Sequence, residues 1–263
     1  MRMIFLGAGK GSRLYPYTSD KPKWLLPIDN KPIIDYLISC AHENEISDLV
    51  LIRGLTGKKF KDERISCIED LDNFNMLHSL MKARRLLTDE TIISYCDILY
   101  EPTVLSKLKS SSADFSVIID RQWEEYYLSR NSDIFAIAES LILNGTQIIE
   151  IGQPIIARRL PEGQYIGLMK FSSKAMKVFC NIYEELSTAY EGKPWRNAQE
   201  FKTAYLTDML QELIERNFCI EAIEIEGGWL EFDTKSDYES VLKWEAEGSL
   251  SRFLDLSTFW NNS

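Results

Sequence analysis

The first 120 residues alternate between short apolar runs and longer stretches in which apolar residues recur at helical spacing. The short runs are bounded by glycine or by charged residues, which is typical of strands buried on both faces. They lie at residues 3–6, 48–52, 91–95 and 115–119, with a weaker run at 65–68. Helical spacing occurs at 32–41 and 75–87. This alternation predicts an α/β layer fold with a mostly parallel sheet.

The pattern changes beyond residue 120. Apolar runs at 136–143 and 146–151 flank Asn144-Gly145, a pair that suits a two-residue hairpin turn with positive φ. Further elements are predicted in this order: a strand at 165–171, helices at about 173–189 and 197–216, and strands at 219–225 and 229–232. Ser236-Asp237-Tyr238-Glu239 is interpreted as a capping box that opens a last helix. We therefore expect a doubly wound, Rossmann-like sheet with helices on both faces and an antiparallel insertion over one side of the site.

The segment that follows the first predicted strand is rich in glycine and in cations. Gly7, Gly9 and Gly11 lie within five residues, so backbone N–H groups there can approach an anion without side-chain obstruction. The cations of this region are Lys10, Arg13, Lys21 and Lys23, and Pro22 stiffens the segment that carries the last two. Exposed amides beside such cations are a chemistry for polyphosphate. The dinucleotide pattern G-x-G-x-x-G fails at Ser12, and no Gly-Lys-Ser or Gly-Lys-Thr completes a P-loop.

The charge distribution narrows the class of ligand. The chain carries a formal net charge of −10, which argues against binding nucleic acid through a general basic field. Residues 1–31 differ from the rest, with six lysine and arginine side chains against two aspartates. A local cationic patch on an acidic protein suits a small anionic ligand.

Several features predict a soluble protein of a reducing compartment. The five cysteines are odd in number and contain no C-x-x-C pair, which predicts free, buried thiols. No apolar run approaches the ~20 residues of a membrane span, and the glycine loop interrupts the first apolar run, so no signal peptide is expected. His42 and His78 have no partners at metal spacing, which argues against zinc. We expect a cytoplasmic location.

Two aspartates follow predicted strands. Asp97 comes after the strand at 91–95, and Asp233 comes after the strand at 229–232. In open parallel sheets, ligands bind outside the carboxyl ends of the strands, so both carboxylates can face the glycine loop. Mg²⁺ takes one or two carboxylates and fills its other positions with phosphate oxygens and water, and we predict that these aspartates bind it. The alternative is that each aspartate caps a turn or a helix.

The pattern G-x-G-x-G-[ST]-R-[LM] at Gly7 to Leu14, followed by Pro22-Lys23, resembles the signature of the sugar-phosphate nucleotidyltransferase superfamily. The resemblance implies that the glycine loop wraps a nucleoside triphosphate and that Arg13 and Lys23 act in catalysis by neutralising its phosphates. The nucleotide-binding residues implied for this loop are Leu6, Gly7, Ala8, Gly9, Lys10, Gly11 and Ser12. Asp97-Ile98 and Trp229-x-Glu231-x-Asp233-Thr234-x-x-Asp237 resemble the two metal-binding motifs of the family.

Two further groups of residues resemble a narrower branch of that superfamily. Asn75-x-x-x-Ser79-Leu80 resembles the segment that contacts base and ribose in cytidylyltransferases, and its spacing would place Asn75 and Ser79 on one helix face. The segments Trp123-x-x-x-Tyr127-x-x-Arg130, Ala138-Glu139 and Gly163-x-Tyr165-Ile166-Gly167-x-x-Lys170 together resemble the phosphocholine and phosphonate cytidylyltransferases. The acceptor contacts that this implies are Trp123, Tyr127, Arg130, Gly167 and Lys170, with the two cations on the acceptor's phosphate. The alternatives are a surface asparagine with a helix serine, and a surface aromatic cluster with solvated cations.

The resemblance implies a CTP-dependent cytidylyltransferase that uses Mg²⁺. It would transfer CMP to a small phosphorylated or phosphonylated head group, such as phosphocholine, an aminoalkylphosphonate or a phosphorylated amino acid, and release pyrophosphate. The alternatives are a sugar-1-phosphate nucleotidyltransferase using UTP or dTTP, and a catalytically silent nucleotide-sensing module. A homo-oligomer is left open. We expect one domain over residues 1–263, with a nucleotide-binding part at about 1–120, an acceptor-side part at about 121–235 that includes the antiparallel insertion, and a C-terminal helix and tail at about 236–263.

Overall fold

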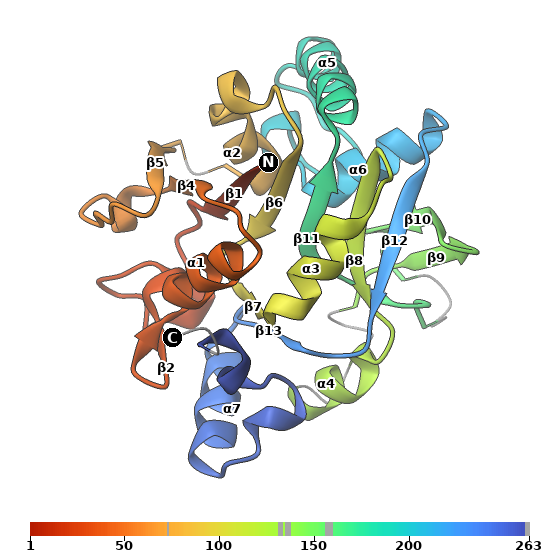
Figure 1. Cartoon of the computed structure of the whole chain (residues 1–263). Coiled ribbons are helices and arrows are strands. Elements are labelled where there is room, and N and C mark those ends of the chain that lie inside the picture. Colours follow the sequence, from red (N-terminus) through yellow and green to blue (C-terminus); the bar gives the residue numbers. More distant parts are fainter. Residues whose placement is uncertain (73, 131–133, 135–137, 156–159, 261–263) are drawn as a thin grey trace.

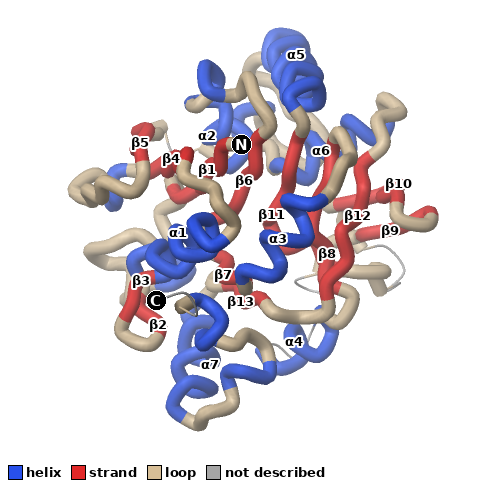
Figure 2. The backbone as a smooth tube through the Cα atoms, viewed as in Figure 1, coloured by secondary structure: helices blue, strands red, loops and turns tan. Residues whose placement is uncertain are grey.

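A large mixed sheet forms the centre of the computed structural model, which describes residues 1–263 except 73, 131–133, 135–137, 156–159 and 261–263. Within the described residues, nine strands form this sheet in the order β5-β4-β1-β6-β11-β8-β12-β10-β9 (Figures 1 and 2). In chain order these strands are β1 (Arg2–Gly7), β4 (Asp48–Arg53), β5 (Ser66–Glu69), β6 (Thr91–Tyr95), β8 (Phe115–Asp120), β9 (Leu141–Asn144), β10 (Gln147–Ile151), β11 (Gln164–Phe171) and β12 (Ile220–Ile225). The predicted strands of the first 120 residues are therefore confirmed.

The sheet is mostly parallel, as predicted. β1 pairs in parallel with both β4 and β6, β4 pairs in parallel with β5, and β8 pairs in parallel with β12. β11 is inserted between β6 and β8 and runs antiparallel to both. The start of β11 therefore lies at the carboxyl ends of its neighbours, and its end lies at their amino ends.

Helices cover both faces of the sheet, which confirms the doubly wound prediction. Along β1, Met3 and Phe5 belong to one hydrophobic core, whereas Ile4 and Leu6 belong to the other. The first core is packed by α1 (Ile33–Glu43) and α3 (Pro102–Ser110), and the second by α2 (Met76–Lys82), α5 (Ser173–Ala189) and α6 (Leu206–Glu215). Because both faces are buried, the strands are continuous apolar runs, and that is why the sequence predicts them well.

The antiparallel hairpin forms, but it lies elsewhere than expected. β9 and β10 are joined by Gly145 and Thr146, with φ of 63° at Gly145, so the turn is one residue later than predicted. Asn144 stays paired in β9, opposite Gln147. The hairpin extends the edge of the sheet through β10 and β12 instead of folding back over the sheet. The predicted residues 136 and 137 lie outside the described residues.

Two predicted helices are shorter in the structure. α2 ends at Lys82 and is followed by a 3-10 turn over Arg84–Leu86, while Asn75 precedes α2 as its N-cap. α6 begins only at Leu206, because the segment before it folds into a loop in which Trp195 is 5% exposed and packs against Phe201. The apolar residues of that loop are buried in the core although their backbone is irregular. Their spacing in the sequence resembles that of a helix, and the predicted helix was therefore too long.

The N-cap of the last helix, α7 (Lys235–Ala246), lies two residues before the start of the predicted capping box. Thr234 is its N-cap: the Thr234 hydroxyl accepts a hydrogen bond of 3.2 Å from the Asp237 N–H, and the Asp237 carboxylate accepts one of 2.7 Å from the Thr234 N–H. The box is thus Thr234-x-x-Asp237. Asp233 lies just outside it, so Asp233 is not the helix cap.

Short elements, of which the sequence analysis predicted only the strand at 229–232, bring distant segments together. β7 (Ile98–Tyr100) and β13 (Trp229–Glu231) form a separate two-stranded antiparallel sheet, and the Phe232 N–H donates a 2.7 Å hydrogen bond to the Asp97 carbonyl. A second small sheet joins β2 (Pro27–Ile28) to β3 (Lys31–Pro32), and α4 (Trp123–Arg130) lies beside α7 at the bottom of Figure 1. The β7–β13 pair places the segment after residue 228 against the carboxyl end of β6.

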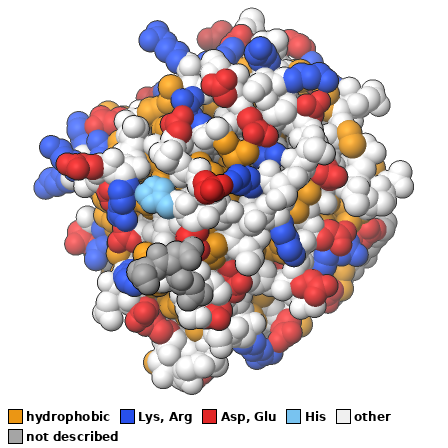
Figure 3. Space-filling model, in the orientation of Figure 1, with side chains coloured by type: hydrophobic (Ala, Val, Ile, Leu, Met, Phe, Trp, Pro, Cys, Tyr) orange, Lys and Arg blue, Asp and Glu red, His pale blue; other side chains and the backbone are white. Residues whose placement is uncertain are grey.

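Surface charges, helices and cysteines bear on the expectations drawn from composition. On the face shown in Figure 3, acidic and basic side chains are interspersed. None of the described helices is both long enough and apolar enough to cross a membrane. All five cysteines are free thiols, as predicted, and Cys40, Cys96 and Cys180 are buried. The prediction of burial is wrong for Cys219, which is exposed, and holds only in part for half-buried Cys67.

Candidate active site

A pocket of about 460 Å³ opens at the carboxyl ends of β1 and β6. Parts of the chain that are far apart in sequence form its walls. They are residues 6–13, Lys23 and Trp24, residues 74–76, Ser79, residues 95–97, Tyr127, Glu139, residues 164–167, Tyr205, Thr207, Glu231 and Asp233. The carboxyl edge of the sheet is where the sequence predicted a ligand site.

Two side-chain hydrogen bonds fix the backbone of the glycine loop. Gly11 adopts φ of 64°, and the Thr18 hydroxyl donates a 2.8 Å hydrogen bond to its carbonyl. The Trp24 indole N–H donates a 3.0 Å hydrogen bond to the Gly7 carbonyl. Gly9 is exposed, and a methyl group there would meet no atom within 4 Å. The loop therefore presents exposed backbone to the pocket on a buried support.

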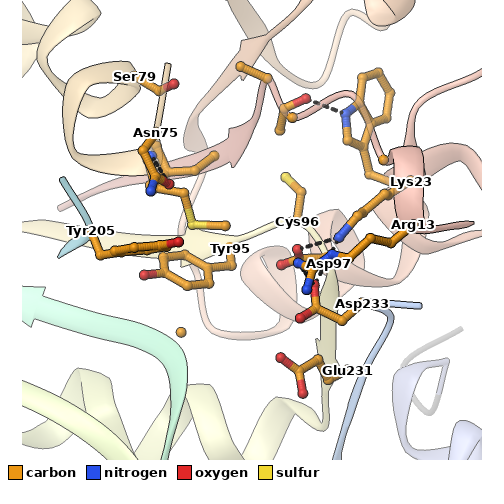
Figure 4. Close-up of a pocket in the computed structure, with 18 of the residues that line it drawn as sticks. Arg13, Lys23, Asn75, Ser79, Tyr95, Cys96, Asp97, Tyr205, Glu231 and Asp233 are labelled. Carbon is orange, nitrogen blue, oxygen red and sulfur yellow. Dashed lines mark hydrogen bonds and ion pairs between the residues drawn. The ribbon is translucent and has the colours of Figure 1, made fainter. Parts of the chain in front are cut away.

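The predicted cations and aspartates meet at one point (Figure 4). The Lys23 ammonium lies 2.9 Å from an Asp97 oxygen and 3.1 Å from an Asp233 oxygen, and Arg13 contacts the same Asp233 oxygen at 3.0 Å. The Lys23 side chain is 13% exposed, so these contacts are shielded from water. The structure thus brings together Arg13, Lys23, Asp97 and Asp233 from segments more than 200 residues apart.

Lys23 and Asp233 each favour the charged form of the other. Burial lowers the pKa of Lys23, but the two aspartates outweigh burial and hold it above its ordinary value. Burial raises the pKa of Asp233, but Lys23 and Arg13 reverse that effect and hold it below its ordinary value. The contact between Lys23 and Asp233 is therefore an ion pair at neutral pH.

The donor set of this cluster fits a hard divalent cation bound with a phosphate ligand. Asp97 and Asp233 both contact one atom, the Lys23 nitrogen, so one cation can touch both carboxylates. Among the described residues, no group of three or more His, Cys, Asp or Glu side chains is arranged to hold a metal. Two carboxylates with phosphate oxygens and water would suit Mg²⁺, which rarely binds in an all-protein cage.

Asn75 and Ser79 lie on the pocket wall, on the far side of Tyr95 from Asp97 and Asp233 (Figure 4). The Asn75 side chain caps α2 by accepting a 2.8 Å hydrogen bond from the Met76 N–H, and its amide nitrogen donates to the Thr203 carbonyl at 3.0 Å. The prediction that both residues share a helix face is therefore wrong, because Asn75 precedes the helix. The Ser79 hydroxyl donates to buried Asp70 at 2.5 Å. Contact of either residue with a nucleotide remains a prediction.

The aromatic residues predicted for the acceptor side divide into two groups. Tyr127 and Gly167 line the pocket. Trp123 is 1% exposed and is absent from the pocket wall, and it packs edge-on against Tyr127 with ring centroids 5.2 Å apart. Trp123 therefore supports the wall from behind, and the structure contradicts a direct acceptor contact by its side chain.

Arg130 does not face the pocket. Its guanidinium lies 2.8 Å from Glu231 and 3.0 Å from Asp237, its side chain is 5% exposed, and its charge also lies over the rings of Tyr126 and Tyr127. The prediction that it clamps the acceptor's phosphate is wrong. Instead, Arg130 fixes Glu231, which does line the pocket, and joins α4 to the start of α7.

Lys170 lies at the opposite edge of the sheet. It pairs in register with Ile92, near the start of β6, and its ammonium contacts the carbonyls of Lys109 and Ser111 and the carboxylate of Glu90. Because β11 is antiparallel, its residues 164–167 reach the pocket while its last residues point away from it. The predicted contact between Lys170 and the acceptor is therefore wrong.

Several pocket residues were not predicted as site residues. They include Tyr95, Glu139, Gln164, Tyr165, Tyr205, Thr207 and Glu231. Glu139, Tyr165 and Glu231 lie inside motifs that the sequence analysis quotes, and knowledge of the direction of β11 would have pointed to Gln164. Tyr205 and Thr207 sit in a loop and first turn that the predicted long helix concealed. Burial and the nearby Asp233 raise the pKa of Glu231, although the contact with Arg130 opposes this.

Comparisons with known proteins identify relatives of this chain. A family model described as a MobA-like NTP transferase domain matches residues 3–161. The chain is similar to the CTP:phosphoglutamine cytidylyltransferase of Campylobacter jejuni, with 32% identity over 254 residues that cover 91% of this chain and 98% of that protein. It is also similar to the choline-phosphate cytidylyltransferase of Streptococcus pneumoniae, with 29% identity over 139 residues that cover 51% of this chain and 60% of that protein.

Solved structures share the fold. The inositol-1-phosphate CTP transferase from T. maritima matches with a TM-score of 0.70 and 16% identity, covering 97% of each chain. At that identity the likeness concerns the arrangement of the elements, and it supports the same architecture from the glycine loop to the C-terminal segment.

Proposed function

The chain belongs to the MobA-like NTP transferase family and is a nucleotidyltransferase, and from this premise we propose that it transfers CMP from CTP to a small phosphorylated or phosphonylated acceptor. The observation that carries the proposal is the convergence of Arg13, Lys23, Asp97 and Asp233 beside an open glycine loop in one pocket. The relatives named above support CTP as the donor and a phosphorylated small molecule as the acceptor.

The reaction needs alignment and charge neutralisation more than proton transfer. An oxygen of the acceptor's phosphate attacks the α-phosphorus of CTP; a P–O bond forms there as the bond to the bridging oxygen breaks, and pyrophosphate leaves. A phosphate monoester has a second pKa of about 6, so it is already ionised near neutral pH and needs no general base. The glycine-loop amides, Arg13 and Lys23 neutralise the triphosphate and the departing pyrophosphate.

We also propose that Asp97 and Asp233 hold Mg²⁺ in the reacting complex. When bound, the ion would neutralise phosphate charge and polarise phosphoryl oxygens. Lys23 now makes contacts with both carboxylates. If Mg²⁺ engaged these two carboxylates, the Lys23 ammonium would be available to the phosphates. Arg13, whose side chain is 65% exposed, can reach the same phosphates from the mouth of the pocket.

A pyrophosphate-release assay tests this function. The protein is incubated with each of CTP, UTP, dTTP and ATP and with a panel of phosphocholine, phosphoethanolamine, 2-aminoethylphosphonate and phosphorylated amino acids, with Mg²⁺ or with EDTA. We expect release that depends on both CTP and an acceptor and that EDTA abolishes. Undiminished release in EDTA would refute the metal site, and a clear preference for UTP or dTTP would favour sugar-phosphate chemistry instead.

A further inference from the structure

The positively charged side chains of the pocket wall come from one part of the chain, whereas its negatively charged side chains come from several. The cationic side chains among the described lining residues are Lys10, Arg13 and Lys23, and all three belong to the glycine loop or to the turn that follows it. Beyond the aspartates, the wall carries the carboxylates of Glu139 and Glu231 and several tyrosine rings. The end of an acceptor that points away from its phosphate would therefore meet negative charge.

Gln164 adds an unpaired acceptor atom to this wall. It is 5% exposed and begins β11, opposite Asp120 in the register. Its amide nitrogen donates a hydrogen bond to the Tyr165 carbonyl at 3.5 Å. Its amide oxygen is buried and has no hydrogen-bond partner among the residues that the structure describes. Buried side-chain oxygens are nearly always paired, so a ligand that donates an N–H or O–H here would satisfy an otherwise costly atom.

Glu139 supplies a charge without a counter-ion. Within the described residues it makes no ion pair and accepts no hydrogen bond, and burial, followed by the charges of Asp208 and Asp233, raises its pKa. Burial raises the pKa values of Tyr95 and Tyr165, and the Glu139 charge adds to both effects. Glu139 lines the same pocket as Gln164 and these two rings, and a cationic ligand there would stabilise its carboxylate.

We propose that Glu139 and Gln164 bind a primary ammonium group at the far end of the acceptor. The inference rests on the proposed function and specifies its substrate class: a phosphorylated or phosphonylated primary amine, including an amino acid. The Glu139 carboxylate supplies charge, and the Gln164 oxygen accepts an N–H. A trimethylammonium group could satisfy the charge and the aromatic rings, but it has no N–H for Gln164.

Phosphoethanolamine and phosphocholine form a matched pair of probes, because they differ only in three methyl groups on nitrogen. With CTP and Mg²⁺, we expect kcat/KM for phosphoethanolamine to exceed that for phosphocholine at least about tenfold, and the N-methyl and N,N-dimethyl compounds to fall between them. Gln164→Leu should shrink this ratio to near one, and Glu139→Gln should weaken the use of both compounds. Equal use of the two compounds by the wild type would overturn the proposal.

Matched controls separate this inference from folding effects and from the proposed function. Gln122→Leu and Glu124→Gln make the same changes at exposed positions outside this pocket and should leave the ratio unchanged. If neither compound is turned over, calorimetry on protein saturated with CTP and Mg²⁺ measures their affinities. Tighter binding of phosphoethanolamine that Gln164→Leu abolishes supports the proposal; equal binding, or none, overturns it. Failure to bind CTP at all would instead refute the proposed function.

Discussion

At the scale of single residues, the site depends on one lysine that touches two carboxylates. Lys23 and its partners were predicted because each has a local signal: a Pro-Lys pair after a glycine loop, and aspartates that follow strands. Their contacts were not predicted, because they join residues that are more than 70 positions apart in the chain. A local pattern identifies the chemistry of a residue, whereas its partner depends on the path of the whole chain.

Lys23→Ala should lower kcat by about 10²–10³, or about 3–4 kcal/mol, by analogy with the loss of one preorganised donor to a developing anion. Steady-state pyrophosphate release measures the effect. Lys21→Ala is the matched control, since Lys21 is a half-buried lysine two positions away that does not line the pocket. A comparable loss in both variants would mean that general positive charge is what matters, and not the position of Lys23.

Asp233 and Thr234 are neighbours with separable roles. Thr234→Ala removes the N-cap of α7 and should cost about 1 kcal/mol of unfolding free energy while most activity survives. Asp233→Asn leaves that cap in place and should remove most turnover. Urea unfolding and pyrophosphate release, measured on both variants, distinguish the two. Near wild-type turnover of Asp233→Asn at low Mg²⁺ would exclude this residue as a metal ligand.

At the scale of elements, β11 decides which predicted residues reach the site. The sequence predicts this strand correctly at 165–171 but carries no local mark of its direction, and an antiparallel insertion reverses which end faces the pocket. That single unknown explains why Lys170 was wrongly assigned and Gln164 was missed. Strand pairing is a property of the sheet, so the periodicity of one strand cannot supply it.

Gly167 tests how β11 shapes the pocket. It adopts φ of 90°, and a methyl group there would lie 2.5 Å from the Tyr95 ring. Gly167→Ala should therefore cost about 1–3 kcal/mol of stability through backbone strain and, by displacing Tyr95, should weaken acceptor use. Gly145→Ala, at φ of 63° with no atom within 4 Å, is the control for strain alone. Thermal unfolding and acceptor kcat/KM measure both, and an unchanged kcat/KM in Gly167→Ala would show that Tyr95 does not shape the acceptor side.

Arg130 joins α4 to β13 and α7 by pairing with Glu231 and Asp237. Because it is buried, Arg130→Ala leaves two carboxylates without their cation and should cost about 3–5 kcal/mol of unfolding free energy. Arg252→Ala breaks an exposed pair with Glu125 and should cost less than about 1 kcal/mol. Denaturant unfolding compares the two variants. Equal, small losses would mean that the Arg130 pair is not structurally important.

At the scale of the whole molecule, the sequence shows the layers better than the connections between them. Strands such as 48–52 and 115–119 are buried on both faces, so their apolar character is visible without knowing their neighbours. β7 has only three residues and was missed, and β13 was predicted as the strand at 229–232 but without its partner, because no local pattern marks the pairing of the two. Yet their pairing is what places Asp233 beside Asp97, and half of the candidate metal site depends on it.

That connection makes a prediction for the stability of the entire chain. The pocket takes Arg13, Lys23 and Asp97 from the first 120 residues and Asp233 from the C-terminal segment, and the Phe232–Asp97 hydrogen bond links the two. If residues 1–263 unfold as one cooperative domain, CTP with Mg²⁺ at about 100 times its Kd should add about 2.7 kcal/mol and move a single calorimetric transition to higher temperature. Asp233→Asn should reduce the shift that Mg²⁺ adds, because it removes one carboxylate from the cluster. Two transitions, of which one ignores the ligand, would show instead that the C-terminal segment folds independently and that Asp233 contributes little to binding.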